Sequence, residues 1–126
     1  MGKNIVAILG VAFVAAGIAG FIDPLTPDGE LLGLAVNPVH NVIHLLTGIA
    51  ALAAVASGAA STRLYAQVFG VVYAVVTILG FINGSGELLG LVAINQADNF
   101  FHLVVTAVLL YIGFGEETAT PRRSAA

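Results

Sequence analysis

Polar side chains with the capacity for chemistry gather in two short runs inside otherwise apolar segments. The first run, Asn-Pro-Val-His-Asn-Val-Ile-His-Leu, covers residues 37–45, and the second, Asn-Gln-Ala-Asp-Asn-Phe-Phe-His-Leu, covers residues 95–103. Residues three or four positions apart share one face of a helix, so each run presents its polar groups together. The candidate polar cluster consists of His40, Asn41, His44, Asp98, Asn99 and His102 from these runs, together with Glu30 and Glu87.

His44 and His102 hold matching positions in the two runs. At a rise of 1.5 Å per residue, each lies roughly 10 Å inside the start of its helix. Lipid contact is unfavourable for an imidazole at that depth, so both rings should face the bundle interior. Imidazole is a frequent metal ligand. The pair could therefore bind haem b or, together with Glu30 and Glu87, a divalent metal ion.

The favoured interpretation is a structural network that contains neither a cofactor nor a metal ion. In this network, histidine and asparagine side chains satisfy backbone carbonyls or the glutamates Glu30 and Glu87, which would be buried only with such partners. A minimal transporter or channel unit is a further alternative, because ionisable groups inside a membrane are functional candidates. The path beyond the histidines is sparse, with only Thr47, Ser57, Thr77 and Thr106 offering polarity.

Catalysis has little support in the sequence. It contains no nucleophile elbow, HExxH motif, CxxC pair or glycine-rich loop followed by lysine, and it has no cysteine at all. Asp98 and His102 could form an acid–imidazole pair, but no nucleophile stands beside them. We therefore expect a protein that is not an enzyme.

The composition places the chain in a membrane. Of its 126 residues, 59% are hydrophobic and only 9% are charged, against roughly 25% charged residues in an ordinary soluble domain. So few charges exclude a cytosolic enzyme and a nucleic-acid-binding protein with a basic face. Four stretches approach or exceed the roughly 20 apolar residues that a membrane helix needs, namely 5–22, 38–60, 64–82 and 96–114.

The chain also contains an internal repeat. Gly-Phe-Ile occurs at 20–22 and 80–82, and Gly-Glu-Leu-Leu-Gly-Leu occurs at 29–34 and 86–91. We predict a single membrane domain over residues 1–126 with an all-α fold, an integral membrane four-helix bundle. Its two parallel two-helix repeats span about 5–60 and about 64–114, and a pseudo-two-fold axis along the membrane normal relates them.

Each repeat carries helix-start and packing signals. Asn37 before Pro38, and Asn95 three residues before Asp98, predict the N-caps of the second and fourth helices. The Gly-Glu-Leu-Leu-Gly segments are too short to cross and too apolar for free loops, so they should form short interfacial or re-entrant elements. Small residues at four-residue spacing predict helix packing faces: Ala12, Ala16, Gly20, Ala50, Ala54 and Gly58.

The basic residues predict the orientation. Lys3, Arg63, Arg122 and Arg123 all fall on one side of four crossings, and the positive-inside rule makes that side cytoplasmic. We expect a multi-pass protein of a bacterial plasma membrane with both termini in the cytoplasm and a disordered tail at 115–126. The expected partners are membrane lipid and either further copies of the chain or a larger membrane complex, with no nucleic acid. The favoured role is a structural or accessory subunit.

The two polar runs also carry a family resemblance. The pattern Asn-Pro-x-His-Asn-x-x-His-Leu-x-x-Gly at 37–48, with Asn-x-x-Asp-Asn-x-x-His at 95–102, resembles small bacterial membrane proteins catalogued as domain of unknown function "forty-three eighty-three". Gly48 matches the family glycine, whereas Thr106 replaces it in the second copy. The resemblance covers residues 5–114. It implies a four-helix membrane fold and brings no activity, ligand or partner.

Overall fold

The computed structural model describes residues 1–115 and contains four long helices there. They are α1 (Gly2–Ala19), α2 (Pro38–Ser57), α3 (Ala59–Asn83) and α4 (Gln96–Leu110), and a π-helical turn, η3 (Tyr111–Gly115), extends α4. All four are long and apolar enough to cross a membrane. The chain is therefore a multi-pass membrane protein, and the predicted all-α four-helix fold is confirmed. The tail predicted to be disordered falls, from residue 116 onward, outside the described residues.

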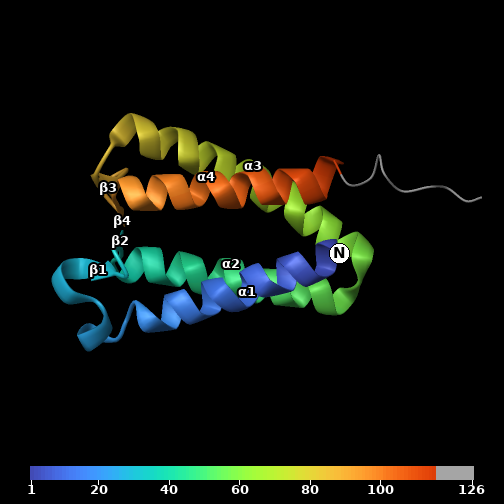
Figure 1. Cartoon of the computed structure of the whole chain (residues 1–126), viewed down its shortest axis with the longest axis horizontal. Coiled ribbons are helices and arrows are strands. Elements are labelled where there is room, and N and C mark those ends of the chain that lie inside the picture. Colours follow the sequence, from blue (N-terminus) through green and yellow to red (C-terminus); the bar gives the residue numbers. More distant parts are fainter. Residues whose placement is uncertain (116–126) are drawn as a thin grey trace, which may run out of the picture.

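The helices form two antiparallel pairs. Helix α1 packs along α2, and α3 packs along α4 (Figure 1). The N-terminus, the link between α2 and α3 and the end of η3 lie at one end of the molecule, while the connections inside each pair lie at the other. The two repeats therefore point the same way.

The Gly-Glu-Leu-Leu-Gly segments form antiparallel β-hairpins at the end of the bundle. In the first repeat, two short turns, η1 (Asp23–Leu25) and η2 (Pro27–Gly29), lead into β1 (Glu30–Leu31) and β2 (Leu34–Ala35). In the second repeat, β3 (Gly86–Leu88) pairs with β4 (Val92–Ile94). Pairing across each hairpin satisfies backbone groups that an apolar loop would leave without partners. The segments thus lie at the predicted end of the bundle, in the form of strand pairs.

Glycines allow the helices of each pair to approach closely. A Cβ atom added at Gly48 would lie 2.6 Å from the carbonyl oxygen of Gly10, and one at Gly20 would collide with the side chain of Asn41. In the second repeat, a Cβ atom added at Gly80 would collide with the side chain of Asn99 in the same way. Small residues therefore do mediate helix packing, as in other membrane bundles.

The predicted packing residues are only partly the ones used. Ala12 faces outward and Ala16 is half-buried, because the contact face of α1 is set by glycines instead. Ala50 and Ala54 border the core as predicted. Gly58 separates α2 from α3 with φ 125° and no atom near its Cβ position, so its role is a turn and not a packing contact.

The central core holds large side chains from α1, α3 and α4, and α2 contributes the small Ala51. Phe13, Tyr65, Tyr73 and Leu109 are buried there. Many apolar side chains on the outer faces are exposed, as expected where lipid and not water surrounds the protein. The three histidines His40, His44 and His102 lie between this core and the second hairpin.

Candidate metal site

The starts of α2 and α4 are fixed by asparagine caps. The side chain of Asn37 accepts a hydrogen bond from the backbone N–H of His40 at 3.0 Å. Asn95 does the same for Asp98 at 3.0 Å, and the Asp98 carboxylate accepts the Asn95 N–H in return, which completes a capping box. These caps set the phase in which each polar run enters the bundle.

The same two asparagines join the repeats. Asn37 Nδ2 donates to the carbonyl oxygen of Leu91 at 3.0 Å, and Asn95 Nδ2 donates to the carbonyl oxygen of Gly33 at 2.9 Å. Each cap therefore bonds to the hairpin of the other repeat. This reciprocal exchange is what a two-fold relation between the repeats produces, and it aligns α2 and α4 at matching depths.

His40 is oriented by a further contact between the repeats. Its Nδ1 lies 2.7 Å from the carbonyl oxygen of Ala93 in β4. A carbonyl only accepts, so Nδ1 carries the hydrogen and Nε2 keeps its lone pair in the neutral ring. Metal-binding histidines commonly donate their second ring N–H to a backbone carbonyl in this way.

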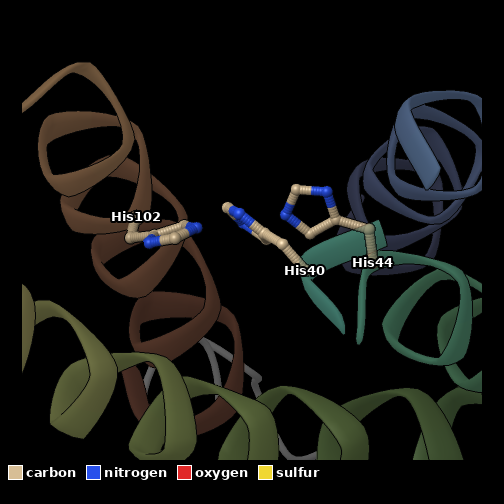
Figure 2. Close-up of side chains that lie close together, drawn as sticks. All are labelled: His40, His44 and His102. Carbon is tan, nitrogen blue, oxygen red and sulfur yellow. The ribbon is translucent and has the colours of Figure 1, made fainter. Parts of the chain in front are cut away.

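Three imidazoles converge between the helix pairs. His40 and His44 come from α2 and His102 comes from α4, and each is at most 4% exposed. Figure 2 draws His40 between the other two rings in this view, and the ring centroids form a triangle, with His40 4.3 Å from His44 and 5.8 Å from His102. One ring nitrogen from each residue lies within 4.8 Å of those of the other two. The ring centroids of His44 and His102 are 6.3 Å apart.

The histidine nitrogens are short of hydrogen-bond partners. His40 Nε2, both ring nitrogens of His44 and His102 Nδ1 are buried with no partner among the described residues. A buried polar atom without a partner costs about 1–3 kcal/mol, and native structures contain few of them. Such a concentration of unpaired nitrogens needs an explanation, and a bound ion would provide one.

The three rings line one side of a cavity of about 330 Å³. The other walls are apolar side chains of α2, α3 and the second hairpin, including Ile43, Phe69, Val76 and Ile94. Thr47 and Tyr73 also line it, and the Thr47 Oγ1 lies 3.0 Å from the Tyr73 hydroxyl. The cavity thus combines three nitrogen donors with a mostly apolar interior, the usual composition of a ligand site.

The tyrosines beside the site were missed at the sequence level. The Tyr73 ring lies 5.5 Å from that of His102, and Tyr65 donates its hydroxyl to the carbonyl oxygen of Thr47 at 2.9 Å. The sequence contains a signal for Tyr73, because the internal repeat aligns it with Phe13. The ring centroid of Phe13 lies 5.2 Å from that of His44. Each repeat therefore places an aromatic ring against its histidine neighbour.

The other predicted site residues lie around the cluster and not in it. Asn99 Nδ2 bonds to the carbonyl oxygens of Gly80 and Gly84, so it holds α3 to α4. Asn41 packs against Gly20. Asp98 is buried within its capping box.

The two glutamates are a correction to the sequence analysis. Glu30 and Glu87 are exposed on β1 and β3, and neither belongs to the group of potential ligands. In a β-hairpin, neighbouring residues alternate between faces, and here the buried positions are taken by Leu31 and Leu88. The third member of the cluster is His40.

One comparison with known proteins gives a match. The model of a family described as Domain of unknown function (DUF4383) matches residues 3–115. No curated protein and no solved structure matches the chain.

Proposed function

Since the chain belongs to the DUF4383 family, whose description assigns no activity, we propose from its site that it is a membrane protein that binds one divalent transition-metal ion. The proposed ligands are His40, His44 and His102. The observation that carries the proposal is the convergence of three buried imidazoles, each of which has at least one ring nitrogen without a hydrogen-bond partner among residues 1–115. The proposed function is the binding of a metal ion, and we propose no catalysed reaction.

The chemistry of the ligands favours a first-row ion such as Zn²⁺. Imidazole suits Zn²⁺, Cu²⁺, Fe²⁺ and Ni²⁺, and three histidines are a known set for a zinc site with an open position. A tetrahedral ion with bonds of 2.0–2.1 Å would hold the nitrogens about 3.3 Å apart. The present separations, within 4.8 Å, therefore require only small ring movements on binding.

Haem is a poorer fit than an ion. A porphyrin bound by His44 and His102 would extend sideways from between their rings, and the His40 ring, with its centroid 5.8 Å from that of His102, occupies part of that space. The ring centroids of His40 and His44 are only 4.3 Å apart. The geometry therefore favours a small ion coordinated by all three side chains.

Hydrogen bonding to backbone carbonyls accounts for three of the asparagines and for Nδ1 of His40, and it does not account for His44. Asn37, Asn95 and Asn99 each donate a hydrogen bond to a backbone carbonyl. His44, by contrast, has no hydrogen-bond partner among the described residues. A side chain kept only for network stability would be expected to make such a bond.

We propose a bacterial plasma membrane as the location, with both termini on the cytoplasmic side. Lys3 and Arg63 belong to the end of the bundle away from the hairpins, and the positive-inside rule assigns that end to the cytoplasm. The acidic residues of the hairpin end, Asp23, Asp28 and the two glutamates, fit the opposite side. The metal site would then lie near the outer surface.

We also propose that the protein associates with further copies of itself or with a larger membrane complex. Apolar side chains such as Ile8, Ile78 and Val104 are at least 60% exposed and offer faces for lipid or another helix. Cross-linking in native membranes, followed by identification of the linked chains, tests this association separately from metal binding.

The metal proposal is tested by loading the protein with Co²⁺, whose visible absorption reports tetrahedral coordination. The chain is purified in detergent with a tag free of histidine, stripped with a chelator and titrated. We expect one Co²⁺ per chain, displaced by Zn²⁺, and no binding by the variant in which all three histidines are leucine. Thr106→Val, a buried polar change on α4 outside the cluster, is the matched control and should bind normally. Absence of bound metal, or equal binding by the triple variant, would refute the proposal.

A further inference from the structure

The cavity beside the histidines opens toward the membrane. Its wall includes Ile43 and Leu46 of α2 and Val72 of α3, and these side chains are 38%, 62% and 46% exposed. A residue that lines a cavity and is also exposed marks the place where the cavity meets the outside. This mouth lies between two membrane-spanning helices, so molecules dissolved in the bilayer would reach the histidines from the side.

An ion held by the three histidines would keep a coordination position toward this cavity. All three rings are part of its wall. A zinc-type ion takes four ligands, and sites with three protein ligands leave the fourth position to water or to a bound molecule. The protein therefore supplies three donors and a space of about 330 Å³ for a fourth.

The charge of the site favours an anion as the fourth ligand. Within residues 1–115 the group of potential ligands consists of three histidines without a carboxylate. Neutral imidazoles leave the two positive charges of the ion unbalanced, and an unbalanced charge is costly in an apolar environment. The nearby carboxylate of Asp98 is already engaged by the backbone N–H of Asn95.

We propose that the metal-loaded protein binds a fatty-acid-like carboxylate from the bilayer, with its head on the ion and its alkyl chain in the cavity. The inference rests on the proposed function. It joins three features of the site: the open coordination position, the need for one negative charge, and apolar walls with a mouth in the membrane. A membrane fatty acid supplies the anion and the apolar body in one molecule.

Octanoate and acetate distinguish the contribution of the carboxylate head from that of the alkyl chain, because they share the carboxylate and differ in alkyl length. Co²⁺-loaded protein is titrated with each at one detergent concentration, and the shift of the visible bands is followed. We expect octanoate to act at a concentration lower by at least about tenfold, because its chain buries additional methylene groups.

Two adjacent valines of α3 provide a matched pair of variants. Val76 lines the cavity, whereas Val75 is 50% exposed and is not part of its wall. Val76→Trp should fill the cavity and weaken octanoate binding by at least about tenfold, with Co²⁺ and acetate binding nearly unchanged. Val75→Trp should alter none of the three. If Val76→Trp fails to take up Co²⁺, Val76→Phe replaces it.

The outcomes distinguish the two proposals. Failure of the unmodified protein to bind Co²⁺ refutes both, because the carboxylate then has no ion to bind. Normal Co²⁺ binding with octanoate no stronger than acetate, or with octanoate binding unaffected by the Val76 variants, refutes the fatty-acid inference and leaves the metal site standing.

Discussion

His40 Nδ1 donates a 2.7 Å hydrogen bond to the carbonyl oxygen of Ala93, which lies in the hairpin of the other repeat. This bond fixes the ring and leaves Nε2 for the cluster with His44 and His102. The repeats are thus coupled at the residues that form the site. The contribution of this coupling to the fold can be measured separately from the proposed binding of a metal ion by the histidines.

Replacement of His44 by leucine should separate metal binding from folding. The change removes two buried nitrogens without partners and keeps a similar volume, so the free energy of unfolding of the metal-free protein should change by less than about 1 kcal/mol, or rise. Zn²⁺ at 100 times its dissociation constant should stabilise the unmodified protein by about 2.7 kcal/mol and the variant hardly at all. Thermal unfolding in detergent, with and without Zn²⁺, measures both. A large loss of stability without metal would indicate a structural role for His44.

Asn37→Asp should weaken the junction between the repeats while it keeps the helix cap. The new carboxylate still accepts the His40 N–H, but it cannot donate to the carbonyl oxygen of Leu91. We expect a loss of about 1 kcal/mol in unfolding free energy. Asn37→Ala, which removes both contacts, should cost more, about 2 kcal/mol. Equal stability of the aspartate variant and the parent would show that the Leu91 contact contributes nothing.

Gly20→Ala and Gly80→Ala should each destabilise the bundle by about 1–3 kcal/mol. The added methyl group would collide with Asn41 in the first repeat and with Asn99 in the second. Ala12→Leu serves as the control, because Ala12 faces outward on α1, the helix that Gly20 caps. Unfolding by a denaturing detergent measures all three. A larger loss for Ala12→Leu than for Gly20→Ala would contradict the packing face described here.

Tyr73→Phe should lower stability and spare the metal site. It removes the hydrogen bond between the Tyr73 hydroxyl and Thr47 Oγ1, and keeps the ring that packs near His102. The expected cost is about 1 kcal/mol in unfolding free energy. The visible spectrum of the Co²⁺-loaded variant should match that of the parent. A changed spectrum would place the hydroxyl in the coordination of the ion.

Much of the architecture could be predicted from the chain alone. The apolar stretches marked the helices, and the repeated Gly-Phe-Ile and Gly-Glu-Leu-Leu-Gly segments predicted two units that point the same way. The asparagines before Pro38 and Asp98 marked the helix starts. These features depend on neighbouring residues or on a comparison of the two halves of the chain. A single sequence was therefore sufficient to predict them.

The residues that form the site could not all be identified from the sequence, because their contacts depend on the fold. His40 aligns with Asp98 in the repeat, so matching positions suggested His44 and His102 as a pair and left His40 aside. Its ring position depends on Ala93, which is 53 residues away in the chain. The glutamates were expected in the cluster because the Gly-Glu-Leu-Leu-Gly segments were expected to fold back against the polar runs. The hairpin register, which exposes both glutamates, depends on which leucines the bundle buries.

The exchange of contacts between the repeats has a consequence for biosynthesis. A nascent chain that had inserted only α1 and α2 would contain His40 and His44 but neither His102 nor the carbonyl oxygen that orients His40. Full coordination would have to wait until the last helix had entered the membrane. Bound metal would then mark chains whose insertion is complete. A chain in which only α1 and α2 have been inserted would bind the ion more weakly than the complete protein.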